Sequence, residues 1–195
     1  FMVFGFSELF SVQTEINYTV KGGERIGLQP IPAAQLEGQI PQDAPIPEGT
    51  VFYADFENKS ALEYIEVPIL AKFTLGTDWK VFGNFGPYFG FLVGATQKTD
   101  GFSGISADIP GVEGLVPVLP EQVSFKATTD VRDNIKNFNF GGIAGIGIIK
   151  DIGIKSELFF EVRATYGFIP VQEEEVFGES RIGSVLFSIG YSYQL

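Results

Sequence analysis

The chain has 195 residues, a formal net charge of -11, no His and no Cys. The absence of His and Cys excludes a disulfide framework, the usual zinc sites and Ser-His-Asp or Cys-His nucleophiles. The negative charge argues against nucleic acid as a partner. No run of about 18 apolar residues occurs, so the sequence predicts no transmembrane helix.

Alternation of apolar and polar residues with a period of two predicts seven strands. In chain order they are residues 1–7, which form only the end of a strand, and residues 10–21, 62–75, 80–96, 138–149, 157–168 and 182–195. Tight turns join the hairpins at residues 8–9, 76–79 and 150–153. The other connections, at about residues 22–61, 97–137 and 169–181, are long and hold nine of the eleven prolines. Residues 51–56 and 123–129 are strand-like but too short to span a membrane, and they are interpreted as hairpin extensions above it. We expect residues 1–195 to form a single antiparallel up-and-down domain.

Two fold hypotheses differ in which face of the strands points inward. A soluble barrel would bury the apolar face, as small-ligand carriers do. However, the predicted strands run about 12 to 17 residues where globular strands average about 5 to 6. The apolar face also carries roughly thirty-five residues, too many for an interior of about eight strands. We therefore predict a transmembrane β-barrel with a polar lumen.

Single-chain bacterial barrels have an even number of strands, and closure leaves no unsatisfied edge in lipid. The expected fold is thus an all-β, eight-stranded antiparallel up-and-down transmembrane barrel, with its first strand upstream of Phe1. Pro68 and Pro87 lack a donor for the strand ladder and predict bulges.

Several motifs resemble the PorT-like family of outer-membrane β-barrel proteins of Gram-negative bacteria. They are TEINYTVKGG at residues 14–23, YIEVPILAKF at 64–73 and GPYFGFLVGA at 86–95, followed by FGGIAGIGI and ELFFEVRATYGF. The resemblance covers nearly the whole chain and implies eight strands; the founding member is linked to type IX protein secretion. The last strand resembles the signal that barrel-insertion machinery reads, with Gly190, Tyr193 and Leu195, where Phe is usual in place of Leu195.

Six charged residues fall on the predicted lumen face: Glu15, Glu66, Lys72, Glu157, Glu161 and Arg163. They could form a proton or ion path, or a structural network that fills the barrel. The structural interpretation is favoured because small barrels are usually filled by side chains and buried charges persist when paired. We expect Arg163 to pair with Glu66 or Glu157. The acidic segment 172–179 could bind calcium, but it lacks the ligand spacing of a calcium loop, so a solvated charge run is favoured.

The sequence indicates no catalytic residue, metal or cofactor. We expect a non-enzymatic outer-membrane protein that is a structural or accessory subunit of a larger assembly, with outer-membrane lipid, partner proteins and the insertion machinery as partners. We expect the barrel to lie in the bacterial outer membrane with its long loops extracellular and its short turns and C-terminus periplasmic. The alternative is a stand-alone small pore or transporter.

Overall fold

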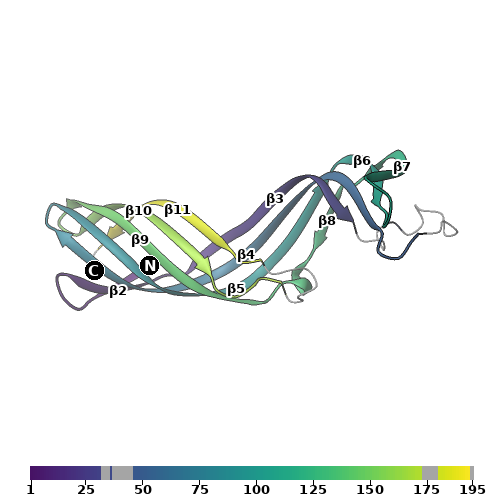
Figure 1. The fold of residues 1–195 in the computed structure, drawn as a ribbon. Helices are drawn as coiled ribbons and strands as arrows, with labels where there is room; N and C mark the ends of the chain where they lie inside the picture. Colours follow the sequence, from purple (N-terminus) through teal and green to yellow (C-terminus); the bar gives the residue numbers. More distant parts are fainter. Residues whose placement is uncertain (32–35, 37–45, 173–179, 194–195) are drawn as a thin grey trace. The chain divides into compact units, whose positions relative to one another are not determined.

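The computed structural model describes residues 1–31, 36, 46–172 and 180–193, and within them the fold is all-β (Figure 1). The strands are β1 (Met2–Gly5), β2 (Phe10–Thr14), β3 (Asn17–Ile31), β4 (Val51–Gly76), β5 (Trp79–Asp100), β6 (Phe102–Asp108), β7 (Leu115–Ser124), β8 (Ala127–Asp130), β9 (Phe138–Gly153), β10 (Ser156–Gly167) and β11 (Gly183–Tyr193). A 3-10 turn, η2 (Arg132–Asn134), precedes β9. No helix in the described ranges is long and apolar enough to cross a membrane.

The main sheet follows the chain as an antiparallel meander. Its order is β1-β2-β4-β5-β9-β10-β11, and β3 continues β2 along the edge of β4. All seven predicted segments therefore occur in the predicted order. The turn between β9 and β10 lies at Ile154 and Lys155 rather than at residues 150–153, because the pairing continues to Ser156 opposite Gly153.

The two prolines have different effects on the ladder. At Pro87 the register between β5 and β9 continues without a shift, so the predicted bulge does not occur on this side of β5. At Pro68 the partner strand is interrupted: the pairing of Thr14 with Ile69 places Pro68 opposite the break between β2 and β3. Proline offers no N–H at this position, and the Thr14 hydroxyl donates to the Pro68 carbonyl at 3.1 Å.

The chain divides into two compact units. The first comprises residues 1–21, 62–95 and 131–195, and the second comprises residues 22–61 and 96–130. The second unit covers most of two predicted long connections, yet it is built largely from strands: the end of β3, the start of β4, the end of β5, and β6 to β8. Because Ile31, Phe52, Ala54, Ile105 and Ala107 are buried together, this unit has a hydrophobic core of its own.

In the first unit, side chains alternate between the two faces of the sheet. The buried polar residues of this unit are Gln13, Glu15, Lys21, Glu66, Asn84, Asn139, Glu161 and Arg163. Large apolar residues at the intervening positions, such as Phe85, Ile146, Phe160 and Ile189, are exposed. The polar face is thus inward and the apolar face outward, as the sequence predicted.

Candidate functional site

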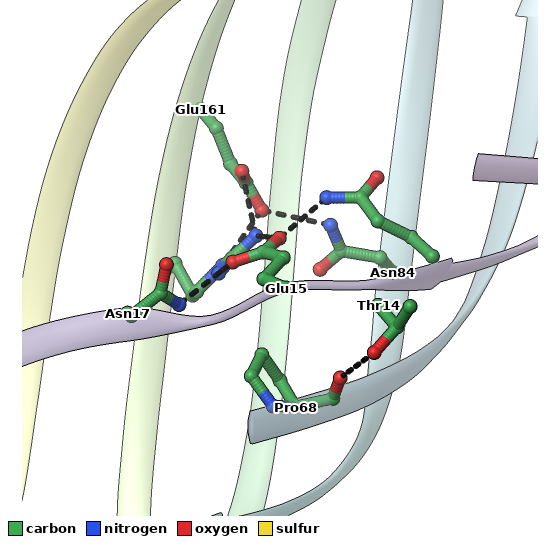
Figure 2. Close-up of polar contacts among 8 residues, drawn as sticks. Thr14, Glu15, Asn17, Pro68, Asn84 and Glu161 are labelled. Atoms are coloured by element: carbon green, nitrogen blue, oxygen red, sulfur yellow. Dashed lines mark hydrogen bonds and ion pairs between the residues drawn. The ribbon is translucent and has the colours of Figure 1, made fainter. Parts of the chain in front are cut away.

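Arg163 is the centre of a buried cluster on the inward face of the first unit. Figure 2 shows its partners Glu15 and Glu161, with Asn17 and Asn84 beside them. The Arg163 guanidinium donates to both carboxylate oxygens of Glu15, at 2.7 and 2.8 Å, and to both oxygens of Glu161, each at 3.0 Å. The Asn84 amide donates to Glu161 at 2.8 Å. Two further amides, of Gln13 at 2.5 Å and Asn17 at 2.8 Å, donate to Glu15. Each buried charge therefore has a charged partner and additional hydrogen bonds.

Glycine on β9 provides the space for this cluster. Gly145 is paired with both Arg163 and Asn84 in the sheet. A Cβ at Gly145 would lie 2.6 Å from Glu161 Oε1 and 2.7 Å from Asn84 Oδ1. Gly141, Gly145 and Gly147 of this strand are therefore small inward residues.

Two further charge clusters lie on the inward face. In one, Lys21 Nζ donates to Glu66 at 2.5 Å and lies 4.9 Å from the centroid of the Tyr88 ring. In the other, near the hairpin turns, Lys80 Nζ binds Asp151 at 2.8 Å and Glu157 at 2.7 Å. In both clusters a lysine on the inward face is therefore neutralised by a carboxylate in direct contact with it.

All six charged residues predicted for the lumen lie on the inward face. The expected partners of Arg163 were wrong, because it pairs with Glu15 and Glu161 while Glu66 pairs with Lys21 and Glu157 with Lys80. The sixth residue is Lys72, whose Nζ lies 4.2 Å from the centroid of the Phe82 ring. The sequence placed Lys21, Lys80 and Asn84 on this face but did not select them as site residues. Strand register was the missing information, since alternation fixes the face but not the neighbours.

Phe159 is the apolar residue that interrupts the polar pattern of β10. Its ring lies over Gly190, where a Cβ would clash with it. Its ring also meets the ring of Phe1 edge to face, with centroids 5.6 Å apart. Gly190 therefore has a packing role besides the predicted assembly signal. Tyr193 is exposed on the outward face, and Leu195 lies outside the described residues.

A cavity of about 690 Å³ opens on this part of the first unit. It is lined by Ile16 in the break before β3, by β3 residues such as Val20, by β11 residues such as Ser184 and Ser188, and by Arg163. Among the described residues, no group of three or more Asp, Glu, His or Cys side chains could hold a metal ion. The acidic segment considered for calcium lies almost wholly outside the described residues.

The described charged residues of the second unit lie on its surface. Lys59 forms ion pairs with Glu57 and with Glu24, the latter at 3.2 Å. The hydrogen bond from Lys59 lowers the pKa of the Glu57 carboxyl, and the hydrogen bonds to Glu57 and Glu24 raise the pKa of the Lys59 ammonium. These groups are solvent-exposed, so the pairs add little to stability.

The outward face of the first unit is a band of apolar rows across β5, β9, β10 and β11. One row contains Val81, Ile148, Phe160 and Ile189, which the strand registers place side by side. The band continues along β5 to Phe91, about 33 Å along the strand at about 3.3 Å per residue. With a strand tilt near 45° this gives a height close to the roughly 25 Å apolar band of outer-membrane barrels.

Aromatic rings mark one end of this band. Phe89 and Phe140 have ring centroids 5.4 Å apart, and Phe140 and Phe168 follow at 5.9 Å. Tyr166 joins them, 6.1 Å from Phe168. Rings at the edge of an apolar band are typical of the interface between a membrane and water.

Comparison with known proteins agrees with this geometry. The family model described as outer membrane protein beta-barrel domain matches residues 2–173. No curated protein and no solved structure gives a significant match.

Proposed function

The chain belongs to the outer membrane protein beta-barrel domain family and is thus an outer-membrane protein, and from this premise we propose that it is a non-enzymatic structural or accessory subunit of a larger outer-membrane assembly. The finer assignment to PorT-like barrels, and with it a role in protein secretion or transport, is part of this proposal and rests on the sequence motifs. The proposed partners are other subunits of the assembly and, during biogenesis, the barrel-insertion machinery.

The observation that carries the proposal is the network of paired charges on the inward face of the first unit, which lines the cavity of about 690 Å³. Arg163, Glu15 and Glu161 are each less than 10% exposed and bind one another across the inward face. A pore needs a continuous path of water, whereas these side chains satisfy one another. The geometry therefore favours a barrel that acts through its surfaces over one that conducts through its lumen.

We also propose that the complete barrel has eight strands. The described sheet ends at β1 and β11, and its seven successive strands alternate in direction, so β1 and β11 run the same way. Direct pairing of these two strands would be parallel. One further strand between them would make every pair antiparallel and satisfy the backbone groups that lipid cannot.

The second unit supports a role in assembly. Its segments hold eleven acidic and four basic residues, which gives -7 of the chain's net charge of -11. Because it has its own hydrophobic core, it can present a fixed surface to a partner. We propose that this unit is extracellular and that the turns between β4 and β5 and between β9 and β10 are periplasmic.

The test is to isolate the protein in its native state. An affinity tag between Val112 and Glu113 lies in an exposed turn between β6 and β7. After extraction of membranes in mild detergent, native electrophoresis and mass spectrometry should show partners in fixed stoichiometry. A protein that migrates alone and conducts ions in planar bilayers would replace this proposal with the small-pore alternative.

A further inference from the structure

One cation breaks the apolar pattern of the outward face. The strand registers align Trp79, Lys150, Leu158 and Tyr191 in a row across β5, β9, β10 and β11. This row lies next to the Val81 row, on the side of the hairpin turns. On the outward positions of β5 from residue 79 to 91, and of the segments of β9, β10 and β11 aligned with them, all of which the structure describes, Lys150 is the only charged residue.

Lys150 has an aromatic neighbour and no carboxylate among these outward positions of β5, β9, β10 and β11. Its Nζ lies 5.0 Å from the centroid of the Trp79 ring. The adjacent acid, Asp151, points to the opposite face because successive side chains of a strand alternate, and it bonds Lys80 at 2.8 Å. An ammonium at the edge of a hydrocarbon band extends toward the headgroups, where it needs an anion.

Other polar groups converge on the same edge. Trp79 is 61% exposed and carries an indole N–H that can only donate. The Tyr191 hydroxyl is in the same row, 2.9 Å from the Ser156 hydroxyl. In the turn beyond it, Lys155 Nζ lies 6.0 Å from the centroid of the Tyr193 ring. Ammonium, indole and hydroxyl donors next to an apolar wall match a phosphate group with acyl chains attached.

We propose that Trp79, Lys150 and Tyr191 form a binding site for the headgroup of an anionic glycerophospholipid, with Lys155 as a second cation at its edge. The phosphate accepts from the Lys150 ammonium and the Trp79 indole, while the acyl chains lie along the Val81 row. The site goes beyond the proposed assembly role and rests on the outward face being in lipid. The site prefers lipids with a negatively charged headgroup, whereas an ordinary aromatic belt needs no charge on the lipid.

The single Trp of the chain allows a direct test at the site itself. The full-length protein is reconstituted in phosphatidylcholine liposomes that contain, at the same low mole fraction, either brominated phosphatidylglycerol or brominated phosphatidylcholine. Bromine quenches the fluorescence of an adjacent indole. We expect the anionic lipid to associate about fivefold more strongly, the effect of one lysine near an anionic lipid surface.

Variants separate the site from a general surface effect. Lys150→Gln should bring the ratio of the two association constants close to one, and Lys150→Arg should retain the preference. Lys126→Gln, the same change of charge in the second unit, should leave it unaltered. Equal quenching by both lipids in the unsubstituted protein would overturn the headgroup site. Quenching by neither lipid would show that Trp79 does not face lipid, and this would also overturn the membrane placement on which the function rests.

Discussion

The guanidinium of Arg163 on β10 binds both carboxylate oxygens of Glu15, at 2.7 and 2.8 Å, although 148 residues separate the two positions. Glu15 lies at the break between β2 and β3, opposite Pro68. The chain therefore places a carboxylate where the strand ladder is interrupted, and a bidentate pair holds that point to a strand near the other end of the sheet. Bidentate arginine pairs combine strength with fixed geometry.

We expect the loss of Arg163 to destabilise the barrel strongly. In Arg163→Met the carboxylates of Glu15 and Glu161 stay buried without their cation, which should lower the free energy of unfolding by about 3–5 kcal/mol. Urea unfolding of the protein folded in detergent micelles measures the difference. Lys59→Met, which removes the exposed pairs with Glu57 and Glu24, should show no measurable change. Equal midpoints for the two variants would contradict the structural role of Arg163.

Two glycines on paired strands should respond differently to the same added methyl group. Gly145 faces the cluster, where a Cβ meets Glu161 and Asn84, and Gly145→Ala should cost about 1–3 kcal/mol. Gly83 on the outward face has only the Gly145 carbonyl oxygen, at 3.8 Å, near its added Cβ. Gly83→Ala should thus be neutral or gain up to about 1 kcal/mol, because alanine restricts the unfolded chain. Similar losses for both variants would argue against the packing described for Gly145.

The packing of Phe159 over Gly190 can be tested with a double-mutant cycle. Gly190→Ala should destabilise the folded protein by about 1–3 kcal/mol because the new methyl group meets the Phe159 ring. In a Phe159→Ala background this loss should disappear, since the ring is gone. Refolding into detergent micelles is the right assay because no insertion machinery is present. If Gly190 acts only as an assembly signal, Gly190→Ala will refold normally in micelles and fail only in cells.

The face of each strand was predictable from the sequence, while the contacts within a face were not. Alternation at Glu157, Glu161 and Arg163 fixed the inward direction because the side-chain period of a strand is two. Choosing Glu15 as the partner of Arg163 requires the curvature of the whole sheet, which no local pattern contains. The second unit was underestimated for a related reason. Its core contains Phe52 and Ile105, which are far apart in the sequence. The segments around them read as loops because only the pairing of β4 with β6 brings the two residues together.

The last prediction concerns the orientation of the protein across the membrane. Thiol labelling can test it because the native chain has no cysteine and gives no background labelling. Glu113→Cys places a thiol in the exposed turn between β6 and β7, and Asp78→Cys places one in the turn between β4 and β5. With the proposed extracellular second unit, a membrane-impermeant maleimide should label Glu113→Cys on intact cells. It should label Asp78→Cys only after the outer membrane is permeabilised. The reverse pattern would invert the orientation and would place the Lys150 site in the outer leaflet. Labelling of both thiols on intact cells would mean that the sheet between them does not span the membrane.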